Sequence, residues 1–106
     1  MPQVPPIPED ADVFTEQGRK VVVMYRRFPE ENRIDTRGFV VKEDGRYTVI
    51  INADMSQIHR NFTLGHELAH VFCGHLDRQG LNFAEKEHEA DTKAWDYFKA
   101  YRDGCL

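Results

Sequence analysis

The hydrophobic pattern of the chain changes its period once, close to residue 56. Before that point, short runs of β-branched and aromatic residues predict β-strands. Glu43-Asp44-Gly45 reads as a turn in which Gly45 can adopt a positive φ, so the runs on either side of it should form a hairpin. The segment 28–37 contains proline, asparagine and aspartate and reads as a loop. The predicted strands are residues 20–25, 38–42 and 46–52.

After residue 56 the apolar positions recur three and four residues apart, which predicts an amphipathic helix that starts at Gln57. Ser56 is the expected N-cap, with Asp54 as the competing candidate, and Gly74 is the expected end of the helix. The apolar stripe of this helix consists of Leu64, Leu68, Val71 and Phe72.

A connector at 76–82 leads to a second predicted helix at 84–101, with Gly104 as a plausible stop. Its apolar positions include Ala90, Ala94, Phe98 and Tyr101. The elements together predict an α+β fold, in which a small antiparallel sheet of about three strands packs with two helices. We expect residues 1–18 to form an extended proline-rich arm and residues 19–106 to form a single domain.

Composition narrows the class of protein. The chain has 106 residues, of which 41% are hydrophobic and 30% charged, typical of one globular domain. Its formal charge of −4 argues against an indiscriminate nucleic-acid binder. The sequence contains neither a long apolar run that could span a membrane nor a secretory signal, and Cys73 and Cys105 are too few for a disulfide scaffold. A cytoplasmic protein is therefore expected.

The candidate chemistry lies in His66-Glu67-Leu68-Ala69-His70, an H-E-x-x-H pattern inside the first predicted helix. Residues four apart share one helical face, so the imidazoles of His66 and His70 can reach the same cation. Glu67 lies beside the metal rather than on it, where its carboxylate can act as a general base toward water. The pattern predicts a catalytic zinc site with two histidine ligands and Glu67 as the base.

A catalytic zinc ion needs a third protein ligand and keeps a fourth position open. The extended pattern H-E-x-x-H-x-x-G-x-x-H would need glycine at position 73 and histidine at position 76, where the chain has Cys73 and Leu76. Gly74 and His75 are each displaced by one residue from that pattern. The third ligand should therefore come from the second predicted helix.

That helix offers three glutamates, of which we choose Glu87 because its face continues into the apolar stripe that packs on the first helix. Asp91 lies four residues later on the same face. Its carboxylate can accept a hydrogen bond from a liganding histidine and so fix the tautomer of that ring. Glu89 points about 200° away from Glu87 around the helix axis. We expect Glu89 and Glu85 to be solvated acids, and both stay open as alternative ligands.

Residues 52–70 resemble the core of the ImmA/IrrE-like metallopeptidases. In that family a strand ending in Asn leads into a helix with an Arg-x-Phe-Thr-x-x-His-Glu-x-x-His motif, matched here by residues 60–70. A later helix carries Glu-x-Glu-Ala followed by Asn or Asp, matched here by residues 87–91. The family is related to the gluzincins, whose third ligand is the first glutamate of a Glu-x-x-x-Asp unit. The resemblance therefore also implies Glu87.

What the resemblance implies is a minimal zincin-like domain and a zinc-dependent metalloendopeptidase of narrow specificity. Family members typically cut a partner transcriptional repressor in phage, mobile elements or stress responses. A helix-turn-helix repressor is thus the expected protein partner, and no direct binding of nucleic acid or membrane is expected. The alternative is a non-catalytic, zinc-stabilised module that binds a regulator, against which Glu67 speaks because a structural site needs no base. A DNA-associated zinc protease is a third interpretation, disfavoured by the acidic balance.

Two further expectations concern the surroundings of the site. The strand segment 47–51 immediately precedes the metal helix, and if it lies at the sheet edge, an extended substrate could pair with its backbone. Cys73 is expected to be a small buried or half-buried side chain. His59, His75 and His88 are expected to be surface or hydrogen-bonded histidines.

Overall fold

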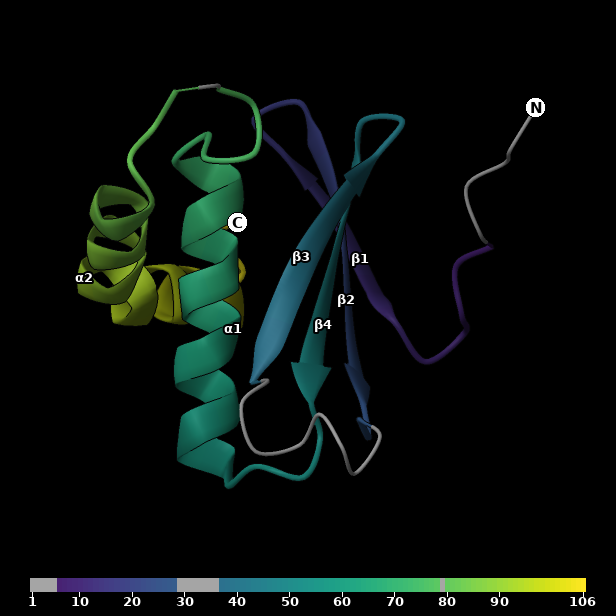
Figure 1. Ribbon diagram of the computed structural model, residues 1–106. Coiled ribbons are helices and arrows are strands. Elements are labelled where there is room, and N and C mark those ends of the chain that lie inside the picture. The colour runs from purple at the N-terminus through teal and green to yellow at the C-terminus, as the bar shows by residue number, and fades with distance from the viewer. Residues whose placement is uncertain (1–5, 29–36, 79) are drawn as a thin grey trace.

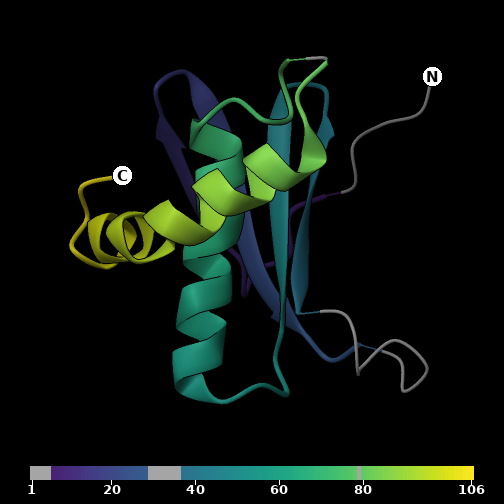
Figure 2. The same cartoon turned by 60° about the vertical axis from the view of Figure 1, so that its left-hand side comes forward.

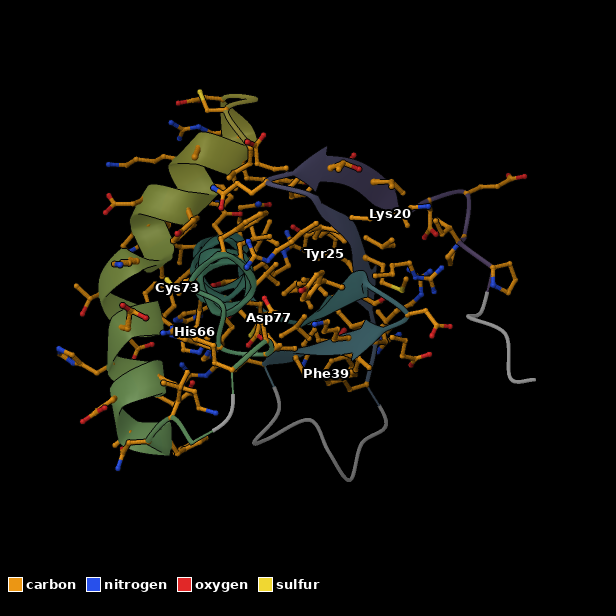
Figure 3. All side chains as sticks on the ribbon, turned by 90° about the horizontal axis from the view of Figure 1, so that it is seen from above. Lys20, Tyr25, Phe39, His66, Cys73 and Asp77 are labelled. Carbon is orange, nitrogen blue, oxygen red and sulfur yellow. The ribbon has the colours of Figure 1, made fainter. Side chains whose placement is uncertain are left out.

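The computed structural model describes residues 6–28, 37–78 and 80–106. Over these residues the chain forms a mixed sheet and two helices, an α+β fold (Figure 1). One helix lies directly on a face of the sheet, and the other covers the first helix on its far side (Figure 3). The elements are β1 (Asp12–Glu16), β2 (Arg19–Arg26), β3 (Gly38–Glu43), β4 (Arg46–Asn52), α1 (Gln57–Phe72) and α2 (Phe83–Arg102).

The strands follow the order β1-β2-β4-β3. The predicted hairpin of β3 and β4 is confirmed, and Gly45 has φ +78° in its turn. The expectation of a purely antiparallel sheet is wrong, because β2 and β4 pair in parallel. Strand β3, which follows β2 in the chain, lies one position away from β2 in the sheet. The hairpin then places β4 in the position between them. Residues 29–36 of the predicted loop lie outside the described residues.

The sheet has four strands rather than about three, because β1 pairs antiparallel with β2. This strand occupies part of the segment for which an extended arm was expected. Gln17 and Gly18, both at positive φ, form the tight turn between the two strands. Such a two-residue turn matches the twist of a hairpin, and Val13-Phe14-Thr15 before it are strand-forming residues. The prolines upstream favour an extended arm, and that composition outweighs this short run in the sequence pattern.

Strand β4 lies inside the sheet, between β2 and β3. The condition under which residues 47–51 could pair with a substrate, a place at the sheet edge, is therefore not met, and β3 is the edge strand on that side. The side chains of Val49 and Ile51 are completely buried, because they lie on the face of the sheet that α1 covers.

Helix α1 packs its predicted stripe on the sheet, and all four residues of that stripe are buried. Ser56 is the N-cap and accepts a hydrogen bond from the backbone N–H of His59, so the competing choice of Asp54 is not needed. The helix ends at Phe72, immediately before the Cys73 cap and Gly74 at φ +75°. The core between helix and sheet comprises Val21, Val23, Tyr47, Val49, Ile51, Leu64, Leu68, Val71 and Phe72.

The two helices cross at a steep angle on the side of α1 away from the sheet (Figure 2). Gly65 makes their close approach possible: a Cβ at this position would lie 1.9 Å from the backbone oxygen of Ala94. Ala90 and Ala94 are fully buried at this contact, so the small residues of the predicted α2 stripe do face α1. Neither described helix combines the length and the hydropathy needed to cross a membrane.

Candidate metal centre

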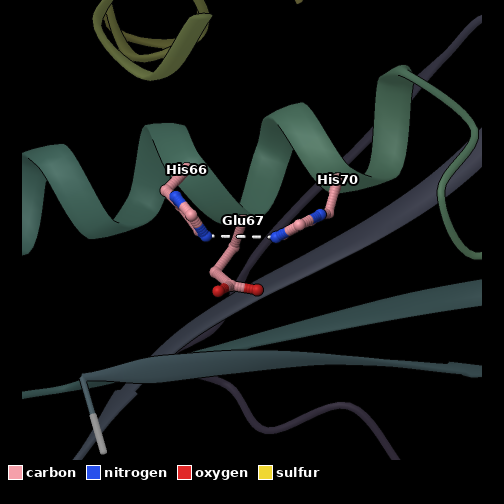
Figure 4. Close-up of side chains that lie close together, drawn as sticks. All are labelled: His66, Glu67 and His70. Atoms are coloured by element: carbon pink, nitrogen blue, oxygen red, sulfur yellow. Dashed lines mark hydrogen bonds between the residues drawn. The ribbon is translucent and has the colours of Figure 1, made fainter. Parts of the chain in front are cut away.

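Helix α1 presents His66 and His70 on one face, as the four-residue spacing predicts. Their rings are nearly perpendicular and point their Nε2 atoms at each other, 3.1 Å apart, with the Glu67 side chain between them (Figure 4). Both imidazoles are largely buried, with side chains 15% and 13% exposed. Burial lowers the pKa of His70, which favours the neutral ring that binds metal ions.

Glu87 of α2 completes the cluster. Its carboxylate lies 2.6 Å from Nε2 of His70 and 3.6 Å from Nε2 of His66. Of the three glutamates considered for this helix, Glu87 is thus the one that the helix crossing brings between the two rings. Ligand atoms around a tetrahedral zinc ion lie about 3.3 Å apart at the usual bond lengths. Two of the three separations are close to that value, and the third is shorter.

Asp91 lies one turn further along α2 and contacts the other side of His66, with Oδ1 2.7 Å from Nδ1. An ionised carboxylate can only accept, so Nδ1–H of His66 donates to it. In the neutral ring the lone pair then belongs to Nε2, the atom that faces His70 and Glu87. The donor set is therefore two imidazoles and a carboxylate around one point, which fits a zinc ion.

Glu67 is the most deeply buried carboxylate of the site, with only 7% of the residue exposed. Burial raises its pKa from 4.5 to about 7, and the nearby carboxylate of Glu87 adds to the shift, while His66 opposes it. A carboxylate with such a pKa can take up and release a proton near neutral pH, which is the requirement for a general base.

The site opens into a cavity of about 290 Å³ between α1, α2 and the start of β3. A second hollow of about 280 Å³ shares Gly38, Glu67 and Glu87 with it and continues along β3 over apolar side chains. Its apolar lining residues are Phe39, Val40, Leu76 and Phe83. Together the two hollows form a groove beside the edge strand, with Glu67 lining both halves.

Two residues of the site were not identified from the sequence. His75, expected at the surface or in a hydrogen bond, is buried with 6% of the residue exposed and lies 2.8 Å from His70. Glu89, expected to be a solvated acid, is partly exposed, with 39% of its side chain accessible, but it also accepts a hydrogen bond from His75. A signal for His75 exists in the sequence, because a glycine that ends a helix turns the next residue back over its last turn.

Comparison with known families agrees with this geometry. The model of the peptidase M78 family, described as the IrrE N-terminal-like domain, matches residues 16–101. The chain therefore belongs to this family of metallopeptidase-type domains, as the resemblance of residues 52–70 and 87–91 predicts. Comparisons with curated proteins and with solved structures found no match.

Proposed function

We propose that this chain is a zinc-dependent metalloendopeptidase of narrow specificity, with His66, His70 and Glu87 as metal ligands. The observation that carries the proposal is the position of Glu67. Its buried carboxylate lies in a group with both histidines, yet the ligand cluster is complete without it. A residue so placed serves chemistry rather than metal binding.

A zinc ion bound there would act as a Lewis acid on the scissile carbonyl and on the attacking water. Glu67 would accept the proton of that water and later pass it to the leaving nitrogen, because its carboxylate lies beside both histidines. Asp91 holds His66 in the tautomer that directs its Nε2 lone pair at the centre. The walls contributed by β3 and α2 limit the access of bulk water to Glu67.

The substrate would bind as an extended peptide along β3. Among the described residues no strand pairs with the outer side of β3, so the backbone groups on that side can add another strand by hydrogen bonding. The groove beside it offers the cavity near Asp91 on one side of Glu67 and the apolar hollow near Phe83 on the other. The two hollows at the site are small, so we expect the orientation of a peptide to depend also on contacts made by a folded partner. We propose a helix-turn-helix repressor as that partner, by analogy with the family.

A non-catalytic module that binds a regulator through a structural zinc site is the second candidate. Burial of Glu67 speaks against it, because placing an ionisable carboxyl in a desolvated position costs stability and a binding module gains nothing in return. The two functions differ in what Glu67 is needed for, and one substitution separates them.

Glu67→Gln keeps the size and polarity of the side chain but removes the basic carboxylate. If Glu67 is the general base, the variant should bind zinc as the wild type does, while cleavage falls by at least about 100-fold, the usual contribution of such a group. Both zinc-loaded proteins are incubated with a repressor encoded beside this chain and with a proteome-derived peptide library, and the products are resolved by mass spectrometry. Casein serves as the control for unselective proteolysis and should be degraded poorly.

A discrete cut by the wild type alone supports the peptidase. Binding of the repressor without any cut by either protein, together with an intact library, would establish the binding module instead. Equal cutting by both proteins would remove Glu67 from the mechanism.

A further inference from the structure

His70 contacts a third group besides Glu87 and His66. Its Nδ1 atom lies 2.8 Å from Nδ1 of His75, and Nε2 of His75 lies 2.5 Å from the carboxylate of Glu89. The side chain of His75 is 3% exposed, so it is nearly sealed from solvent between the two partners. A chain of two imidazoles and one carboxylate thus extends from the metal centre to the surface of α2.

The backbone at the end of α1 places His75 in this position. The N–H of His75 donates to the carbonyl of His70, and the N–H of Gly74 donates to the carbonyl of Val71. These two bonds define a Schellman cap, which folds the residue after the glycine back onto the residue three positions before the cap. The pair brought together in this way is commonly apolar, whereas here both members are histidines. Their contact is therefore built into the helix end.

The direction of the hydrogen bonds follows from Glu89. Glu89 also receives a hydrogen bond from the ammonium group of Lys93, and a carboxylate paired with a cation in this way can only accept from His75. Nε2 of His75 therefore carries the proton, and Nδ1 of a neutral ring is left as an acceptor. His70 must then donate its Nδ1–H, which leaves the lone pair of its own Nε2 directed at His66 and Glu87.

We propose that His75 and Glu89 are positioning residues that hold His70 in the tautomer and ring orientation required of a metal ligand. The inference rests on the zinc centre proposed above. Asp91 orients His66 by direct contact with its Nδ1 atom. Glu89 orients His70 indirectly, through the imidazole of His75. Removing either member of the pair frees the ring of His70 and lets its proton move to Nε2, where it blocks metal binding.

A competing use of the same side chains is a second metal site, because Cys73, His75 and Glu89 also offer ligand atoms close together. Their surroundings favour the relay. Lys93 lies 3.4 Å from the Glu89 carboxylate and competes with a cation for it. Burial also raises the pKa of the Cys73 thiol, which keeps it protonated. The number of zinc ions bound per chain distinguishes the two uses.

The first test measures zinc affinity by competition with a chromophoric chelator for wild type, Glu89→Ala and Glu85→Ala. Glu85 is the matched control, because it is an exposed glutamate one helical turn earlier on α2. Glu89→Ala should weaken zinc binding by about 10-fold, the lower end of what loss of such outer contacts costs. Glu85→Ala should stay within about twofold of wild type. His75→Phe, which keeps a ring but has no nitrogen, should weaken binding at least as much as Glu89→Ala.

The second test reads the proton positions directly in the zinc-loaded protein. Long-range ¹⁵N–¹H spectra should show His75 with its proton on Nε2, and Glu89→Ala should mix the two tautomers, which a merely structural role of Glu89 would not cause. Unchanged zinc affinity in Glu89→Ala, a His75 proton on Nδ1, or two zinc ions per wild-type chain would each overturn the inference while leaving the peptidase standing. Wild-type protein that takes up no zinc would overturn both.

Discussion

Glu67 in α1 and Asp77 just after it carry the same chemical group, but folding shifts their pKa values in opposite directions. Glu67 is buried in the metal centre, and its pKa is raised to about 7 by desolvation. Asp77, in the connection after α1, has a pKa well below its usual range because Lys42, Tyr47 and Arg19 donate hydrogen bonds to it. Figure 3 shows Asp77 between the helices and the sheet.

The difference follows from the surroundings of each carboxylate: hydrogen-bond donors surround Asp77, whereas Glu67 is buried away from water. Asp77 ties the connection to three strands, because its donors belong to β2, β3 and β4. An ionised carboxylate is stabilised there and cannot act as a base near neutral pH. Glu67 holds its proton more tightly because burial removes its carboxylate from water, an effect that His66 opposes and that the second carboxylate, Glu87, reinforces. One region uses charge for anchoring, and the other keeps a carboxylate ready for proton transfer.

The largest expected effect is a steric one at the contact of α1 and α2, which supports the metal centre and not the Asp77 region. Gly65→Ala should destabilise the protein by more than about 3 kcal/mol, because the added Cβ would meet backbone atoms of Ala94 that cannot move without shifting α2. Zinc affinity should fall with it, since Glu87 and Asp91 are on α2. Urea unfolding and zinc competition measure the two effects. Gly104→Ala adds a methyl group where no atom lies within 4 Å and should cost only about 1 kcal/mol for its positive φ.

The next effect concerns the metal-free protein and its pH dependence. The pKa of Glu67 is higher in the folded state than in the unfolded chain, so its contribution to stability is fully present below about pH 4.5 and is lost as pH rises to about 7. The loss should reach about 3 kcal/mol at most. Urea unfolding in the presence of a chelator, from pH 4 to pH 8, should therefore show wild type losing stability relative to Glu67→Gln over this range. A difference that stays constant with pH would contradict the assignment.

The smallest expected effect concerns Asp77, whose contribution to stability changes with pH in the opposite direction to that of Glu67. The pKa of Asp77 is depressed by folding, so its stabilisation is present above its unfolded value of 3.8 and is lost as pH falls further. Asp77→Asn should cost about 1 kcal/mol at pH 7, since the cluster is partly exposed, and should flatten the acid limb of the stability curve. Asp96→Asn, on the exposed face of α2, is the control and should change neither. Zinc affinity should be unaffected, which distinguishes this region from the metal centre.

The local pattern predicted much of the site. The spacing of His66 and His70 requires one helical face, and the i, i+4 relation of Glu87 and Asp91 does the same on the second helix. Their placement against one another also followed, because the apolar stripes of both helices had to meet. The sequence pattern did not predict the contact of His75 with Glu89, because it joins the end of α1 to α2 and periodicity describes only residues within one element.

The sequence by itself determined the two helices, three of the strands, the caps at Ser56 and Gly74 and the metal-binding motif, since all of these depend on contacts between residues a few positions apart. Only the tertiary structure decided that β4 lies inside the sheet and that β3 forms the edge beside the site. It also decided the acid strength of Glu67, because desolvation depends on which distant segments cover a side chain. Strand order and burial are set by the competition of all segments for one core, and no local window of the sequence contains that competition.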